Sequence, residues 1–244
     1  MTNLLKRNLK IFFRDKANVF FSLLSVIIII GLYVLFLGDV VISDLKEIDN
    51  ARFLMDSWIM AGVLAVSSMT TTLGAFSIMV EDKAKKLLKD FSASPVSRRS
   101  LAAGYILNAF TVGIILSLIS FVFAEIYIVA YGGRLLDFST LIKLLGCILL
   151  SVLSSSAMVC LLVSFFKSQN AFGTASMLIG TLIGFLTGTY MPINILPVPV
   201  QYVVKIFPVS HAAALFRQIM MDAPLRDAFA GASAGAADAF KKDL

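Results

Sequence analysis

The chain has 244 residues, of which 59% are hydrophobic and 15% are charged, and its formal net charge is +6. A soluble domain is about 45–50% apolar and about 25% charged, and a globule of this size cannot hide such an apolar excess in one core. The composition therefore excludes a soluble enzyme, a disordered chain and a disulfide scaffold, and it predicts an all-α, polytopic membrane protein. The basic residues collect at the ends of apolar segments rather than on one face, so nucleic acid is not an expected partner.

The first sixteen residues predict an amphipathic helix, because an apolar stripe runs beside a basic one at helical spacing. Such a helix lies in the headgroup plane of a negatively charged leaflet, with membrane lipids as its partners. The apolar run that follows, Val19 to Leu37, is too long for the core of a signal peptide, and no small-residue cleavage site follows it. We therefore interpret residues 1–16 as an interfacial helix that leads into an uncleaved first span.

Five segments are long and apolar enough to cross a bilayer, which takes about 20 residues. These predicted spans are residues 18–38, 58–80, 102–130, 141–166 and 171–190. The third is too long for one straight crossing, so we expect it to tilt, break or end outside the hydrocarbon. Glu125, near its far end, either reaches the interface by snorkelling or lines a polar path.

The basic residues of the connecting segments predict the orientation. Five Lys or Arg lie in the first sixteen residues, six lie in loop 81–100, and Lys167 lies between spans four and five. The opposite side carries four basic residues: Lys46, Arg52, Arg134 and Lys143. Twelve against four favours the first set as cytoplasmic, because cytoplasmic loops are enriched in Lys and Arg. We predict a multi-pass protein whose N-terminus is cytoplasmic.

The sequence changes character after the fifth span, where four prolines follow in quick succession: Pro192, Pro197, Pro199 and Pro208. They exclude one continuous helix, so residues 190–210 are expected to form a re-entrant hairpin in the outer leaflet. Residues 223–244 are rich in small residues and cannot span, and the alternation places them outside the cell. Truncation before a sixth span would explain this ending. Residues 1–222 are predicted to form a single membrane domain.

Few residues offer enzyme chemistry. The sequence has no GxxxxGK[ST] phosphate loop, no metal-ligand cluster and no GxSxG setting. Cys147 and Cys160 lie in one apolar stretch and are expected to face lipid or to pack. His211, the sole histidine, is interpreted as an interfacial or capping residue rather than a ligand or base. We therefore predict neither catalytic residues nor a metal or cofactor in this chain.

The loop over residues 81–100 is the most informative of the connections. It predicts a short amphipathic helix, a turn at Ser94-Pro95 and a basic start to span three, and its apolar face is formed by Leu87, Leu88 and Phe91. One interpretation is a basic surface loop that only fixes topology. The other is a docking helix whose apolar face enters a groove on a cytoplasmic partner.

Small and hydroxyl residues mark three of the spans. A ridge on span five contains Ser176, Gly180, Gly184 and Gly188, which permits close approach of a helix in the same subunit or in a second copy. Spans two and four carry clusters of serine and threonine, which either line a conduit or pack the helices. These clusters are Ser67, Ser68, Thr70, Thr71, Thr72 and Ser77, and Ser151, Ser154, Ser155 and Ser156. No charged pair lies in the middle of a span, which argues against transport coupled to protons or sodium.

Three stretches together resemble the type 2 ABC-transporter permease family, the membrane subunits of ABC exporters. The first is the basic N-terminal helix that leads straight into span one. The second is the loop that begins Glu81-Asp82-Lys83 and closes with SPVSR at residues 94–98. The third is the pattern that follows span five: Gly188, Pro192, Pro197, Pro208, His211 and Arg217. The chain departs from the family at Ala84 and Lys85, where members usually carry a glycine, and in showing five spans where members usually have six.

The resemblance implies a half-conduit. Two permease subunits, identical or different, pair around a path, and each rests through loop 81–100 on a cytoplasmic ATPase subunit that binds ATP and Mg. The residues expected to couple to that ATPase are Glu81, Asp82, Lys85, Leu87, Leu88, Phe91, Pro95 and Arg98. The residues expected to shape the re-entrant hairpin are Pro192, Pro197, Pro208, His211 and Arg217.

The sequence thus predicts the permease subunit of an ATP-driven exporter, acting in efflux in the cell membrane of a prokaryote. A non-transporting membrane scaffold or sensor subunit is the alternative. The odd number of visible spans and the lack of ionisable groups at mid-membrane motivate that alternative.

Overall fold

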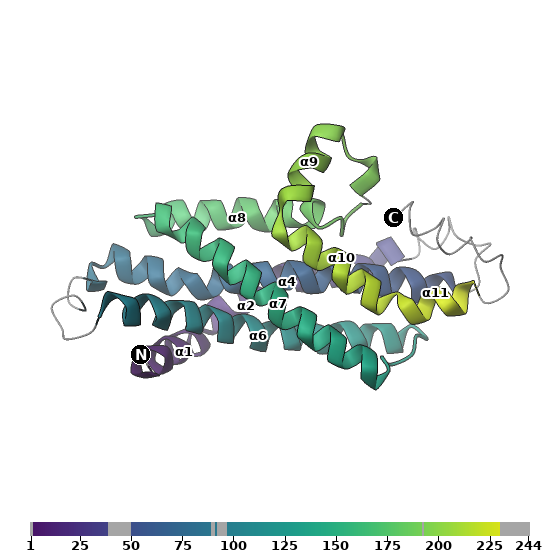
Figure 1. The fold of residues 1–244 in the computed structure, drawn as a ribbon, viewed down its shortest axis with the longest axis horizontal. Coiled ribbons are helices and arrows are strands. Elements are labelled where there is room, and N and C mark those ends of the chain that lie inside the picture. The colour runs from purple at the N-terminus through teal and green to yellow at the C-terminus, as the bar shows by residue number, and fades with distance from the viewer. Residues whose placement is uncertain (1, 39–49, 89–90, 92–96, 192, 230–244) are drawn as a thin grey trace.

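The computed structural model describes residues 2–38, 50–88, 91, 97–191 and 193–229. Over these residues the secondary structure is helical, and the long helices run beside one another in an elongated bundle (Figure 1). The expectation of an all-α, polytopic membrane fold is confirmed. Pro95, Pro192 and most of the predicted tail lie outside the described residues.

Four described helical segments are long and apolar enough to cross a membrane: Lys16–Leu35, Ala51–Ala84, Arg98–Ala130 and Phe138–Phe165. They correspond to α2 (Lys16–Leu32) with the start of the π-helical turn η1 (Tyr33–Leu37), and to α4, α6 and α7 over the last three of those ranges. Helices α4 and α6, with 34 and 33 residues, measure about 50 Å at 1.5 Å per residue. Because a bilayer core is only about 30 Å thick, both helices extend beyond it, and the predicted third span is one unbroken helix.

The predicted fifth span is the shortest of the set. Helix α8 (Gln169–Leu186) covers most of it, but this 18-residue helix is not among the four that are long and apolar enough to cross a membrane. It ends at Leu186 rather than at residue 190, so Gly188 lies beyond the helix. The prediction that Gly188 belongs to a helical ridge is therefore wrong.

The segment after α8 folds into short helices: η2 (Ile193–Ile195), α9 (Val198–Ile206), α10 (Pro208–Met220) and α11 (Asp222–Ala228). Helices α9 and α10 meet at an angle of 85°, as a broken span or a re-entrant loop would. Pro208 begins α10, where its missing N–H costs nothing. Figure 1 shows α9 standing away from the bundle while α10 returns along it. The returning limb continues to Met220, past the predicted end of the hairpin at residue 210.

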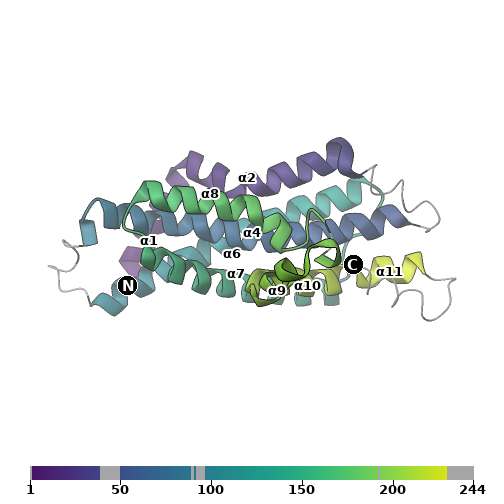
Figure 2. The same cartoon turned by 90° about the horizontal axis from the view of Figure 1, so that it is seen from above.

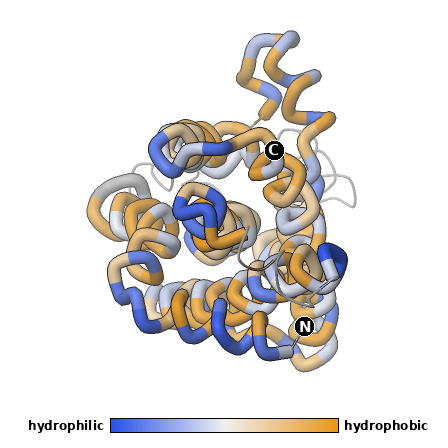
Figure 3. Tube along the Cα trace, turned by 90° about the vertical axis from the view of Figure 1, so that its left-hand side faces the viewer, coloured by the Kyte–Doolittle hydropathy of each residue, from blue (hydrophilic) through white to orange (hydrophobic). Residues whose placement is uncertain are grey.

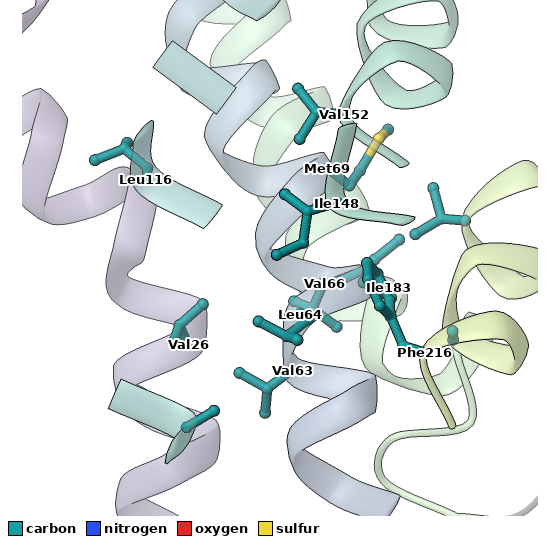
Figure 4. Packing of buried hydrophobic residues seen from close by; sticks show 14 of the residues in the cluster. Val26, Val63, Leu64, Val66, Met69, Leu116, Ile148, Val152, Ile183 and Phe216 are labelled. Carbon is teal, nitrogen blue, oxygen red and sulfur yellow. The ribbon is translucent and has the colours of Figure 1, made fainter. Parts of the chain in front are cut away.

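Helix α4 occupies the centre of the bundle, and most of its residues are buried. It packs against α2, α6, α7, α8 and α10, and Figure 3 shows the helices end-on around a central one, with hydrophobic residues along the outer helices. Figure 4 shows Val63, Leu64 and Val66 of α4 among side chains from the surrounding helices, such as Leu116 and Phe216. The exposed outer faces of α2, α7 and α8 are also apolar, as lipid contact requires.

The serines in the predicted hydroxyl clusters mainly join helices to one another. Ser67 of α4 lies 2.7 Å from the hydroxyl of Ser120 on α6, and Ser68 lies 2.7 Å from Ser151 and 3.2 Å from Ser155 on α7. All of these oxygens are buried in the bundle. For these residues the packing interpretation holds and the conduit-wall interpretation does not.

The N-terminal helix α1 (Thr2–Arg14) packs across α6 at one end of the bundle. Phe12 and Asn8 are fully buried against that end, whereas Ile11 and Phe13 remain exposed. Asp15 then accepts a hydrogen bond from the Asn18 amide at 3.1 Å and caps α2. In both side views, α1 lies at the same end as the close of α4, the start of α6 and the start of α8 (Figures 1 and 2). The segments predicted to be cytoplasmic therefore gather at one end.

Candidate functional site

Asp82, in the last turn of α4, joins three elements at the basic end of the bundle. Its side chain is 5% exposed. Its two carboxylate oxygens accept hydrogen bonds from Arg7 Nη1 at 2.7 Å and Arg7 Nη2 at 2.9 Å, and the Tyr105 hydroxyl of α6 donates to it at 2.6 Å. The sequence singled out Asp82, and the structure brings it together with α1 and α6.

Arg7 and Asp82 form a bidentate ion pair, which is a strong arrangement. A bidentate guanidinium satisfies both oxygens of a carboxylate and fixes its orientation. Hydrogen bonding to Asp82 raises the pKa of Arg7 above its ordinary value, so the guanidinium is charged at any physiological pH. Its carbon also lies 5.5 Å from the centre of the Phe91 ring, which ties the described part of the loop to α1.

Glu81 and Lys85, which precede and follow the junction, behave differently. They pair with each other at 2.5 Å, and their side chains are 45% and 63% exposed. Exposed pairs of this kind contribute little to stability. Of the two acidic residues at the start of the loop, Asp82 is buried. Glu81 remains on the surface, where it pairs with Lys85.

The three residues of the predicted apolar face, Leu87, Leu88 and Phe91, have different surroundings in the structure. Helix α4 ends at Ala84, Lys86 adopts a positive φ of 62°, and a helical segment resumes at Leu87. Leu88 packs against the hydrophobic core and Phe91 lies beneath Arg7, so both contact this chain's own residues. Leu87 is only partly buried and lies outside that core.

The loop closes at α6, which begins at Arg98. The Ser97 hydroxyl accepts a hydrogen bond from the Ser100 amide at 3.2 Å, as an N-cap does. The Arg98 side chain is exposed. Its charge therefore adds to the basic surface at this end.

Beyond the C-terminal end of α8, two residues of the predicted pattern, Gly188 and Arg217, are in direct contact. Gly188 has a φ of +65°, which favours glycine. Its carbonyl accepts a hydrogen bond from Arg217 Nη2 of α10 at 2.9 Å, and the Arg217 guanidinium carbon lies 4.3 Å from the centre of the Trp58 ring of α4. Arg217 thus links the turn after α8 to the central helix, and Trp58 is a partner that sequence reasoning missed.

The other hairpin residues define its bends. Pro197 precedes the first residue of α9, and Pro208 is the first residue of α10. The His211 Nε2 atom lies 2.8 Å from the carbonyl oxygen of Lys205, in the last turn of α9. This contact agrees with the capping role expected for His211, since the last carbonyls of a helix lack partners within it.

The small-residue ridge of α8 is covered over only part of its length. The Tyr190 ring lies against Gly184, so this glycine is used within the subunit. By contrast, a side chain at Gly180 would meet only the Ser25 hydroxyl, at 3.9 Å. Gly180 and Ser176 both open into a groove between α8 and α2.

This groove is floored by α4 and has a volume of about 710 Å³. Its rims carry exposed apolar side chains, including Phe21 of α2 and Met177 of α8. Its floor carries polar groups of α4, among them the Ser77 hydroxyl, which accepts a hydrogen bond from the side-chain amide of Asn18 on α2 at 3.2 Å. The sequence did not predict the groove, because it arises where α2 and α8 both pack on α4 and leave space between them.

The acidic residues of the described ranges offer little further chemistry. Within the described ranges, no group of three or more His, Cys, Asp or Glu side chains is placed to hold a metal ion. Glu125 is 8% exposed near the far end of α6, so its side chain is packed within the bundle.

Comparison with known proteins gives one match. The family model of the ABC-2 type transporter matches residues 1–221, which is almost the whole described bundle. No curated protein and no solved structure matches the chain. The match runs through the basic α1, the Asp82 junction and the Gly188–Arg217 contact. This chain therefore belongs to the ABC-2 type transporter family, as a membrane-spanning permease of an ABC transporter.

Proposed function

We propose that the chain is the permease subunit of an ATP-driven exporter, moved by a separate cytoplasmic ATPase that binds loop 81–100. The sequence has no phosphate loop of its own, and ATP binding in ABC systems requires one. ATP and Mg would then be held by the partner chain. The scaffold alternative has no comparable support, since the matched family is one of transporters.

The observation that carries this proposal is the Asp82 junction. A loop that merely fixes topology needs only exposed positive charge. Here Asp82, the second residue of the loop, is buried and bonded to both α1 and α6. A force applied to the loop would therefore be passed to two other helices rather than absorbed by a flexible connection.

The groove between α2 and α8 supports the second part of the proposal, a conduit shared by two permease copies. Its rims are exposed and apolar, and Gly180 leaves room for a helix to approach closely. We propose that this face meets a second copy, identical or different, and that the polar floor of the groove lines the cargo path. Lipid would cover the outer faces of α6 and α7.

We also propose that the protein lies in a prokaryotic cell membrane, with α1 and the loop in the cytoplasm. The gathering of α1, the end of α4 and the start of α6 at one end supports this orientation. The basic residues of that end match the enrichment expected on the cytoplasmic side.

The docking role is tested by Leu87→Glu. Leu87 is partly buried and is not packed into the core, and a carboxylate there would oppose entry into an apolar groove. Tagged protein is captured from native membranes and the amount of co-purified ATPase is measured. The matched control is Leu135→Glu, the same change at an exposed leucine of the opposite end.

We expect Leu87→Glu to insert normally and to lose most of the ATPase, while Leu135→Glu keeps it. Equal recovery of the ATPase with both variants would overturn the docking role. Loss with both would point to a general defect of the chain instead, and it too would contradict a contact confined to Leu87.

A further inference from the structure

Lys83, next to Asp82 in the last turn of α4, makes a second attachment, to the end of α7. Its ammonium nitrogen lies 3.0 Å from the carbonyl oxygen of Phe166 and 3.4 Å from those of Val163 and Ser164. All three carbonyls belong to the last turn of α7 or to its C-cap.

The chemistry of this contact fits a specific attachment. The last carbonyls of a helix have no partners within it, and they carry the negative end of the helix dipole. A lysine ammonium offers three N–H donors and no acceptor. Lys83 therefore supplies to the end of α7 the positive charge that α7 lacks, since its own last turn contains no basic residue.

The connection beyond α7 is too short to absorb a movement. Only residues 166–168 separate α7 from α8. The Phe166 ring also packs edge-on against Phe172 of α8, with ring centres 5.9 Å apart. Phe172 and Gln169 of α8 line the groove, so a shift of the α7 terminus displaces one wall of that groove.

We infer that Lys83 is a positioning residue that ties the coupling loop to the α7–α8 turn, so that movement of the loop is passed to the α8 wall of the groove. This inference rests on the proposed function. It adds a route of its own: Asp82 connects the loop to α1 and α6, whereas Lys83 connects it to α7 and α8.

The attachment is tested first in the permease alone. Cys147 and Cys160 are replaced by serine, and spin labels are placed at Lys86 and Lys167, which are both exposed. The distance distribution between the labels is measured in lipid nanodiscs. We expect a narrow distribution with Lys83, a broader and longer one with Lys83→Met, and recovery with Lys83→Arg, whose guanidinium also donates to carbonyls. The matched control is Lys85→Met, which removes an exposed lysine two residues away and is expected to leave the distribution unchanged.

Lys83→Met keeps most of the side-chain length and removes the charge together with its N–H donors, and a melting curve for each variant shows whether it is folded. An identical distribution for Lys83 and Lys83→Met in folded protein would overturn the attachment. Equal broadening by Lys85→Met would overturn its specificity.

Transmission is tested in the complex with the captured ATPase, with labels at Phe21 and Met177 across the groove. We expect ATP to shift this distance in the wild type and to shift it less in Lys83→Met at equal ATPase recovery. An equal shift in both would overturn transmission through Lys83. A wild-type distance that ATP leaves unchanged would contradict the proposed function, while the nanodisc result would still decide the attachment.

Discussion

At the scale of single residues, the features that matter are charges placed where a membrane protein can rarely tolerate them. Asp82 is buried in the last turn of α4, where Arg7 and Tyr105 bond to its carboxylate. Removing one partner of a buried pair leaves the other without compensation. The destabilisation should therefore exceed what the loss of an exposed pair produces.

Asp82→Asn is predicted to lower the free energy of unfolding by about 1–3 kcal/mol, the usual cost of an unsatisfied buried polar contact. Glu81→Gln, one residue earlier, is the control and is predicted to cost less than about 1 kcal/mol, because its pair with Lys85 is exposed. Chemical unfolding in detergent micelles measures both. An equal loss of unfolding free energy in the two variants would mean that the buried Asp82 pair contributes no more than the exposed pair.

Replacing Gly188 and Gly146 with alanine is expected to change the stability of the protein in opposite directions. Gly188→Ala would place a side chain on a backbone with φ +65° and within 3.0 Å of Ile193, so we expect a loss of stability of about 1–2 kcal/mol or more. Gly146 lies within helix α7 with nothing within 4 Å, so Gly146→Ala should stabilise by up to about 1 kcal/mol. Thermal unfolding of the two variants would contradict this account if both shifted the midpoint in the same direction.

The sequence could identify Asp82 and Gly188 as candidate functional residues, but it could not identify the residues that they contact. Asp82 and Gly188 were singled out from local patterns. Arg7 lies 75 positions from Asp82, and a local pattern carries no information about a contact at such a separation. The sequence predicts only a basic surface at Lys83, because a lysine that caps a distant helix looks the same in sequence as one in water.

At the scale of elements, hydropathy predicted the helices well and their ends less well. A long apolar run can only satisfy its backbone in a membrane as a helix, which is why α2, α4, α6 and α7 fall where the spans were expected. Helix α8 ends early because Gly188 turns the chain there. The returning limb α10 was missed as an element since its apolar residues face α4 and α7 only after the 85° bend.

The exposed part of the α8 ridge leads to a prediction about pairing. Gly180→Ile would fill the space that a second copy is proposed to approach, and forcing extra methylenes into a close-packed contact costs about 1–3 kcal/mol. We therefore expect a dimer weakened by about tenfold, measured by cross-linking across a dilution series in lipid vesicles. Gly146→Ile, at an exposed glycine of α7, is the control and should leave pairing unchanged. Equal dimer fractions for wild type and Gly180→Ile would exclude α8 as the pairing face.

At the scale of the whole molecule, the bundle has a basic end and an opposite end with fewer basic residues. Orientation follows from this asymmetry. In a chain whose Cys147 and Cys160 are replaced by serine, a single cysteine at Leu135 should react with a membrane-impermeant maleimide in intact cells. A single cysteine at Lys86 should react only after permeabilisation. The reverse pattern would invert the topology and place the loop outside the reach of any cytoplasmic ATPase.

The central claim is that a cytoplasmic ATPase moves this permease through loop 81–100. Its most direct test is the distance between labels at Phe21 on α2 and Met177 on α8, measured in the captured complex with and without ATP. We predict that ATP shifts this distance in the wild type and that Leu87→Glu abolishes the shift while Leu135→Glu preserves it. A distance that ATP leaves unchanged in a complex that hydrolyses ATP would contradict the claim.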